Sequence, residues 1–468
     1  MNGAIEVTKK RILCMVLAVN IVTVILMLLS NYIFKDSPII VFLSFSVNIV
    51  VFTGLIINSI MKHRFSFEFI HLFFMLFMLT LAPLIQNATT GGFLHYYATN
   101  LKIVITNSAF LMWTLFYYIG RYSNKKVKTY NVQLYNFKPL ISQNTEYIMT
   151  FIMIVLAVNK IRVSGISIFR NSAAQTNFSG TGLNVLFFAI RISIVMVAVS
   201  ISIYRYDCSK RISVTMIINL LLSLIIAFPT AIPRFLAATI YGGIILKIFT
   251  NLKRNYIYPI AILGGFIIVF PLFSNFRYAS NNINLMELFK QVISNFKNEY
   301  NTGNYDGYMM FLRTVDYVDD YHVTFGYSLF GNCLFFIPRS IWPSKPVGSG
   351  AFIAEYSNFS FTNCSECLIA ESYLNFGIIG IIVYAFVLGR ITKKIDDIYW
   401  NDPNNIFIQL TYAFYIHVFL ILMRGDFMTG FLYISILTLV FYFFYRMLGI
   451  KKGNIVMNMK TKSVISET

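Results

Sequence analysis

Long apolar runs recur along almost the whole of this chain, and they constrain its fold more than any other feature. Each run is close to the roughly 20 residues that a helix needs to cross the hydrocarbon core of a bilayer, and we predict about 12 such helices. The fold class is therefore an all-α polytopic integral membrane protein. The predicted spans cover residues 12–34, 38–60, 67–86, 99–120, 147–167, 183–204, 212–230, 232–249, 256–274, 368–389, 405–424 and 427–446.

Composition supports the membrane class. Of the 468 residues, 57% are hydrophobic and only 12% are charged, whereas a soluble protein of this length needs more charge to cover its surface. The first apolar run follows Lys9, Lys10 and Arg11 and lacks a small-residue cleavage site, so we interpret it as an uncleaved signal anchor.

The net charge of +19 reflects topology. If both termini are cytoplasmic, the cytoplasmic segments hold 24 of the 38 Lys and Arg residues and the outer side holds 12. This is the positive-inside bias of membrane proteins, and it predicts cytoplasmic N- and C-termini. We therefore expect membrane lipid, and no nucleic acid, as a partner of the basic surface.

One long polar stretch interrupts the apolar pattern. It divides the chain into residues 1–274 with spans one to nine, an extracytoplasmic loop at 275–367, and residues 368–468 with the last three spans and a basic cytoplasmic tail. Loops this long usually carry function. Apolar stripes over 285–296 and 308–318 predict two amphipathic helices, which lie on the membrane surface, cover the bundle or pack on each other.

The segment "FIPRSIWPSKPVGSG", residues 336–350, stands near the end of this loop. Its prolines fix φ and push the preceding residues toward extended geometry, so helix is excluded. We expect the segment to hold Arg339 and Lys345 rigidly over the outer mouth of the bundle.

Six arginines from distant parts of the chain are predicted to reach one level of the outer leaflet. An arginine at the centre of a span costs about 2.5–3.5 kcal/mol on insertion scales, so it usually faces water or the protein interior. The Lys:Arg ratio is 16:8 inside but 6:8 in the spans and outside, and bidentate contact with phosphate favours arginine. A snorkelling role at the interface remains the alternative for each. They are Arg191, Arg234, Arg277, Arg313, Arg339 and Arg424.

Carboxylates and aromatic residues could complete such a site. Glu371, at the outer entrance to the tenth span, is either a general base for a sugar hydroxyl or an ion-pair partner of an arginine. Asp306 is a loop acid, and Asp426 is expected to pair with Arg424. Trp342 offers a flat face for a sugar ring, or it anchors the loop at the interface.

The sequence lacks the motifs that nucleotide-binding, serine-hydrolase and metal-dependent enzymes carry. The chain has no Walker loop, GxSxG or HExxH motif, and the pair Cys364 and Cys367 has no second pair to make a zinc site. We expect no metal and no cofactor. A disulfide is permitted on the outer side, where Cys333 also lies.

Four short motifs resemble the Wzy-type O-antigen polymerases, also described as oligosaccharide repeat unit polymerases. They are "IPRF" at 232–235, "IPRSIWPSKP" at 337–346, "AESYLNFGIIG" at 370–380 and "RGDF" at 424–427. The resemblance extends from about residue 228 to about residue 430, and the earlier spans match in hydropathy alone.

The resemblance implies a bacterial glycosyltransferase of the cytoplasmic membrane. Such an enzyme transfers a growing glycan from undecaprenyl pyrophosphate to an incoming lipid-linked repeat unit at the outer membrane face, without nucleotide sugar or metal. The product is O-antigen or capsule, and a chain-length regulator protein is a candidate partner. An O-antigen ligase and a lipid-linked oligosaccharide flippase or transporter are the alternatives, and the long outer loop argues against a flippase.

The implied site combines these residues. On matching motif positions, Arg234, Arg339 and Arg424 would hold pyrophosphate or glycan, while Lys345 and Glu371 would line the site. We predict Glu371, Arg339 and Arg234 as catalytic residues. The predicted substrate-binding residues are Arg277, Arg313, Lys345, Arg424, Trp342, Asp306 and Arg191.

Overall fold

The computed structural model describes residues 39–123, 143–164, 182–248, 257–272, 286, 290, 299–402 and 405–447. These residues form helices joined by turns, and an isolated bridge between Phe93 and Tyr96 is the β-structure found among them. Arg277, the first apolar run and most of the stripe at 285–296 lie outside the described residues.

Seven helical spans in this part of the chain are long and apolar enough to cross a membrane, which confirms a helical multi-pass membrane protein. One of them is continuous through α3, η1 and α4. The elements are α2 (Ile39–Lys62), α3 (Phe67–Leu76) with η1 (Phe77–Leu81) and α4 (Ala82–Thr90), α5 (Asn100–Ser123), α8 (Gly182–Ser209), α18 (Leu368–Asn401), α19 (Ile406–Arg424) and α20 (Phe427–Met447).

The remaining predicted spans have a different form. The runs at 212–230 and 232–249 become the short helices α9 (Val214–Ile226) and α10 (Arg234–Ile248), because Pro229 and Pro233 interrupt the chain between them. The run at 256–274 becomes α11 (Ile257–Gly264) and η4 (Gly265–Val269). α6 (Gln143–Ser164) covers the run at 147–167 but is not among the seven. The total of twelve spans therefore stays a prediction.

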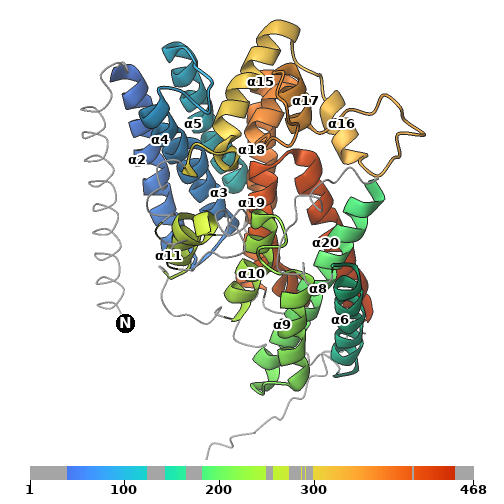
Figure 1. Cartoon of the computed structure of the whole chain (residues 1–468). Helices are drawn as coiled ribbons and strands as arrows, with labels where there is room; N and C mark the ends of the chain where they lie inside the picture. Colours follow the sequence, from blue (N-terminus) through green and yellow to red (C-terminus); the bar gives the residue numbers. More distant parts are fainter. Residues whose placement is uncertain are drawn as a thin grey trace, which may run out of the picture.

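The centre of the bundle is formed by the span from α3 to α4 and by α19. In each of these two spans, 78% of the most apolar window is buried inside the protein, against 28% for α20. A helix that is apolar all round is stable when neighbours cover every face, and α3 and α19 supply that core. Figure 1 shows α19 in the middle of the bundle, with α2 and α5 on one side and α8 and α20 on the other.

A buried ion network ties one end of these helices together. Arg121 of α5 donates to Asp396 of α18 over 2.9 Å and lies 3.0 Å from Glu68 of α3. Asp396 also accepts hydrogen bonds from the backbone N–H of Phe67 and the hydroxyl of Tyr412 on α19. The three charged side chains are at most 4% exposed, so each charge depends on the others.

Glycines allow α5 and α18 to pack backbone against backbone beside this network. A Cβ on Gly120 would lie 2.1 Å from the carbonyl oxygen of Phe386, and one on Gly389 would lie 2.0 Å from that of Tyr117. Small residues at such crossings let membrane helices approach closely. α18 is thereby held tightly against α5.

We expect Arg121→Met to lower the free energy of unfolding by about 3–5 kcal/mol, because Asp396 would stay buried without a cation and Glu68 would keep only Lys62, 3.5 Å away. Thermal unfolding of the purified protein in detergent measures the loss. Arg446, an exposed side chain in the last turn of α20, provides the matched control Arg446→Met, which should unfold like the unsubstituted protein. Equal unfolding temperatures for all three proteins would show that the network contributes no stability.

Three helices of the long polar stretch gather at the opposite end of the bundle, above the start of α18 (Figure 1). They are α15 (Gly307–Tyr321), α16 (Tyr327–Cys333) and α17 (Ser349–Tyr356). α15 confirms the predicted helix at 308–318, and its apolar residues Tyr308, Met309, Phe311 and Leu312 are buried. It packs on α18, α17 and η1, so this helix covers the bundle.

Candidate functional site

A cavity of about 710 Å³ has charged side chains in its lining, and we call it the site pocket. Its walls come from the start of α10, the turn between α19 and α20, and two stretches of the long loop. Three of the predicted cationic side chains line it together, although they are far apart in sequence. Its charged lining residues are Arg339, Lys345, Arg424 and Asp426.

Arg424 is the last residue of α19, and the short 3-10 helix η5 (Gly303–Tyr305) fixes its guanidinium. Its Nη2 donates to the carbonyl oxygen of Gly303 over 2.9 Å and lies 3.3 Å from a carboxylate oxygen of Asp306. The guanidinium also lies 4.6 Å above the ring of Phe235. Part of its donor fork stays directed at the site pocket, because the side chain is 20% exposed.

Asp306 is buried, and its second carboxylate oxygen accepts the backbone N–H of Ser365 over 3.0 Å. Burial raises the pKa of this carboxyl, and the charge of Arg424 together with the bond from Ser365 opposes that shift. Both of its oxygens therefore have protein partners, and Asp306 orients Arg424.

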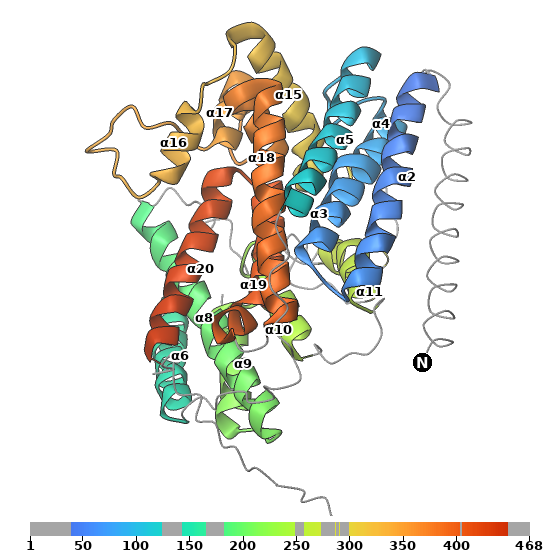
Figure 2. The ribbon, with the colours of Figure 1, turned by 180° about the vertical axis from the view of Figure 1, so that it is seen from behind.

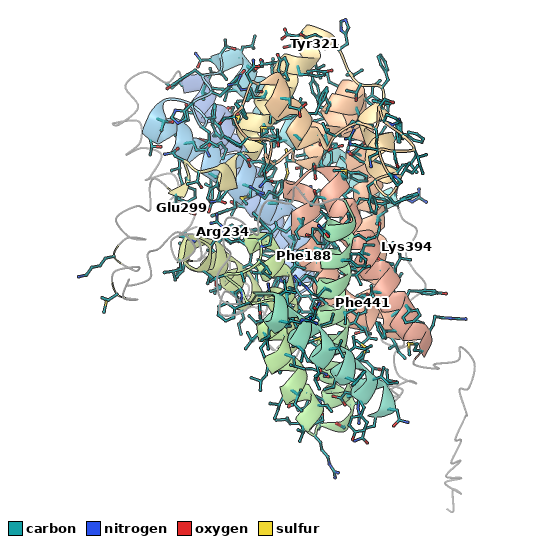
Figure 3. All side chains as sticks on the ribbon, turned by 45° about the vertical axis from the view of Figure 1, so that its right-hand side comes forward. Phe188, Arg234, Glu299, Tyr321, Lys394 and Phe441 are labelled. Atoms are coloured by element: carbon teal, nitrogen blue, oxygen red, sulfur yellow. The ribbon has the colours of Figure 1, made fainter. Side chains whose placement is uncertain are left out.

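Arg234 is the first residue of α10 and lies just behind the wall of the site pocket, which its neighbours Pro233 and Phe235 line. Its guanidinium donates to the side-chain oxygen of Asn304 and lies 3.6 Å from Glu299. Figure 3 labels Arg234 and Glu299 side by side. Since Arg424 binds the carbonyl oxygen of the same Asn304, η5 connects the two arginines.

The segment 336–350 has no helix before Ser349, as predicted, but it is a series of turns and not an extended strand. The N–H groups of Ile341 and Trp342 both donate to the carbonyl oxygen of Pro338, which closes a turn at this point. The prediction of an extended scaffold was therefore wrong in its geometry.

Lys345 closes these turns. Its Nζ donates to the carbonyl oxygens of Phe335 and Ile337 over 3.0 and 2.8 Å, and its own carbonyl accepts from Arg339 over 2.7 Å. Burial and the nearby Arg339 lower the pKa of Lys345. Arg339 itself is exposed and is one of the residues that line the site pocket.

Glu371 lies behind the wall of the site pocket and is fully buried. Its carboxylate accepts from the side chain of Asn332 over 2.5 Å, from the hydroxyl of Ser349 and from the backbone N–H of Phe427 over 3.2 Å. No ion pair between described residues includes it, and these three donors come from α16, α17 and α20. Glu371 thus holds these elements together around the pocket.

Asp426 does not pair with Arg424, contrary to the expectation from sequence. It accepts the backbone N–H of Thr429 over 3.0 Å and so caps the start of α20. Arg424 points back toward η5, because the chain turns at Gly425 between the two residues. Burial raises the pKa of Asp426, which lines the site pocket.

The motif "AESYLNFGIIG" contains a break in α18. Phe376 and Gly377 leave helical geometry, and Gly377 has a φ of 62°, which glycine adopts without steric cost. The break frees backbone carbonyl groups of α18, and the carbonyl oxygen of Leu374 accepts a hydrogen bond from the N–H of Thr324. The side chain of Asn375 accepts from the N–H of Leu329. A kink therefore separates the first turns of α18, which carry Glu371, from the rest of the helix.

Besides Arg234, Asp306 and Glu371, three more of the predicted site residues do not line the site pocket. Arg191 of α8 lies 5.1 Å from the ring of Phe188, which Figure 3 labels, and Arg313 of α15 lies 4.5 Å from the ring of Tyr96. Trp342 donates to Ser344. Residues at the same depth in the membrane can lie on different sides of the bundle. The predicted common level therefore did not bring these three residues to the pocket that Arg339 and Arg424 line.

Sequence reasoning missed two glycines that shape the pocket wall. A Cβ on Gly348 would lie 2.2 Å from a carboxylate oxygen of Asp426, and one on Gly350 would lie 2.2 Å from the carbonyl oxygen of Cys364. The spacing "GSG" after the prolines was the available signal.

Cys364, Cys367 and Cys333 are free thiols, so the permitted disulfide is not formed. In the part of the chain that the structure describes, no group of three His, Cys, Asp or Glu side chains could hold a metal ion.

Comparison with protein families adds to this geometry. Residues 364–452 match the family model described as O-antigen polysaccharide polymerase Wzy. This match supports assignment to the Wzy-type family. It agrees with the resemblance inferred from the motifs at 370–380 and 424–427, whereas the motifs at 232–235 and 337–346 lie outside the matched residues. The matched part begins at Cys364 in the pocket wall and includes Glu371, Arg424 and Asp426. No curated protein and no solved structure matches the chain.

We expect Arg424→Gln to lower the free energy of unfolding by about 1–3 kcal/mol, because Asp306 would lose the cation that compensates its burial. Arg339→Gln is the contrasting variant, because its exposed side chain should change the free energy by less than about 0.5 kcal/mol. Denaturant or thermal unfolding of both variants measures the difference. Equal losses in the two would contradict the assigned contacts.

Glu366 provides a pH prediction. Burial raises the pKa of its carboxyl well above the ordinary value of 4.5, opposed by a hydrogen bond from Thr314 and supported by the charges of Glu371, Asp306 and Asp426. The folded protein then keeps a proton that the unfolded chain releases, so stability should fall as pH rises above about 4.5. Unfolding temperatures between about pH 5 and about pH 8 should show a shallower decline for Glu366→Gln. Parallel curves would refute this origin.

Proposed function

We propose that this chain polymerises polyprenyl-pyrophosphate-linked oligosaccharide repeat units at the outer face of the bacterial cytoplasmic membrane. The observation that carries the proposal is the convergence of Arg339, Lys345 and Arg424 on one pocket, in a chain with a Wzy-type match and membrane-spanning helices. With cytoplasmic termini, as the positive-inside bias predicts, the pocket opens on the outer side.

The pocket suits a pyrophosphate leaving group. Negative charge grows on the pyrophosphate as the glycosidic bond breaks, and guanidinium groups that are already in place stabilise that charge. Arg424 is held by η5 and Arg339 by the carbonyl oxygen of Lys345, so neither has to be ordered when the substrate arrives. Arg234 supports Arg424 through Asn304 and acts from behind the wall.

The proposed reaction is a single glycosyl transfer. A hydroxyl of the incoming repeat unit attacks the anomeric carbon of the growing glycan, and a new glycosidic bond forms. The bond from that carbon to the pyrophosphate oxygen breaks, and its electron pair leaves with the pyrophosphate. The hydroxyl proton passes to a carboxylate.

Asp426 is better placed than Glu371 to accept this proton. Asp426 lines the pocket and its pKa is raised by burial, which makes it a stronger base. Glu371 is surrounded by three donors and lies behind Ser349 and Phe427. We therefore assign Glu371 to positioning the walls and Asp426 to proton transfer.

The test is complementation of a strain that lacks the gene, with glycolipids separated on gels. We expect Arg339→Gln to leave lipid-linked single repeat units unpolymerised while the protein stays folded in the membrane, because an anion contact is lost but no packing. Arg446→Gln is the control and should restore long chains. Long chains made by Arg339→Gln would contradict the proposal, and accumulation of long undecaprenyl-linked glycan would indicate a ligase instead.

A further inference from the structure

A second cavity, of about 600 Å³, runs between α18 and α20, and we call it the apolar groove. α19 forms its back wall and Phe67 of α3 closes its far end. Figure 2 shows α18 in front with α20 to its left, and residues of both helices line the groove. α18 and α20 have few contacts with each other, so the groove lies between two membrane-spanning helices that other elements hold apart.

Hydrocarbon makes up nearly all of the lining. On α18 it uses one helix face, with Val383, Val387, Ile391 and Ile395 at four-residue intervals, which extends for about 18 Å along the helix. The hydroxyls of Tyr415 and Thr438 in the lining bond to each other over 2.7 Å, so they present no free donor. The hydroxyl of Tyr384 is the buried side-chain atom of the described lining that lacks a partner.

The groove is open toward the bilayer along its length. Val383, Val387 and Ile391 keep 49%, 47% and 51% of their surface exposed, although they line a cavity. A soluble ligand would meet these residues only through the membrane. A membrane lipid, by contrast, can enter between α18 and α20 from the side.

The upper end of the groove adjoins the site pocket across α20. Phe427, Phe431 and Ile434 face the groove, while Met428 and Leu432, on the other face of the same helix, line the site pocket. The ring of Phe431 lies 6.3 Å from that of Phe335, which belongs to the site pocket. An apolar space at membrane depth thus ends beside a cationic space at the membrane surface.

We propose that the apolar groove holds the polyprenyl chain of the lipid-linked donor whose pyrophosphate occupies the site pocket. This inference rests on the proposed function. The pyrophosphate needs the cations of the site pocket and the attached chain needs hydrocarbon, and the two cavities offer both within one helix diameter. A phospholipid acyl chain is the competing occupant, and it would not require the neighbouring cations.

The first experiment varies the length of the prenyl chain. Val387→Trp fills the groove, and Leu439→Trp places the same ring on a lipid-facing position of α20 that does not line it. Polymerisation is measured with purified protein and repeat units linked to undecaprenyl or geranyl pyrophosphate. We expect Val387→Trp to raise the KM for the undecaprenyl substrate by at least roughly tenfold, with little change for the geranyl substrate or in kcat.

The control Leu439→Trp should behave like the unsubstituted protein with both substrates. An equal change in KM for the two chain lengths, or no change for either, would overturn the groove assignment. Absence of polymerisation by the unsubstituted protein with both substrates would instead count against the proposed function.

The second experiment does not depend on polymerisation. Undecaprenyl pyrophosphate with a photoreactive group in its first isoprene units should label peptides covering residues 383–395 or 427–438. Val387→Trp should abolish the labelling and Leu439→Trp should not. Labelling elsewhere, or equal labelling by a photoreactive phosphatidylglycerol, would overturn the proposal because the groove would then be an ordinary lipid contact.

Discussion

The buried carboxylate of Glu371 is the interaction on which the site most depends. It accepts hydrogen bonds from α16, α17 and the first residue of α20, while it belongs to α18 itself. A buried charge is tolerated only when such donors surround it. Removing the carboxylate would leave its three buried donors without a hydrogen-bond partner. Through the N–H of Phe427, this carboxylate fixes the start of α20, next to the turn that carries Arg424 and Asp426.

The two ends of the bundle solve the problem of buried charge in different ways. At one end, Arg121 is balanced by Glu68 and Asp396, and all three are enclosed. At the other end, Arg424 has one carboxylate partner in Asp306 and stays partly open to the site pocket. Fully paired charge fixes helices in place, whereas incompletely paired cations remain available to an anion.

Much of the fold could be predicted from the sequence, because the length of an apolar run has a direct physical meaning in a bilayer. The runs from 38–60 to 99–120 and from 368–389 to 427–446 all became long helices. The run at 212–230 did not, because Pro229 lies near its end and α9 already ends at Ile226. Arg339 and Arg424 could be grouped by their level in the membrane, but Arg313 shares that level and points toward Tyr96.

Contacts that depend on irregular backbone had no periodic signal to reveal them. Asn304, which connects Arg234 to Arg424, stands in the three-residue helix η5, which is too short to show a periodic pattern. Ser349, beside Glu371, is the first residue of the short helix α17, directly after the turns of 336–348. The expected pairing of Arg424 with Asp426 failed because two residues across a helix end point in different directions. The close crossing of α5 and α18 has a mechanical consequence: since Gly120 and Gly389 leave no space for α18 to move toward α5, we expect the wall formed by α20, of whose most apolar window 28% is buried, to yield when a bulky branched chain enters from the bilayer.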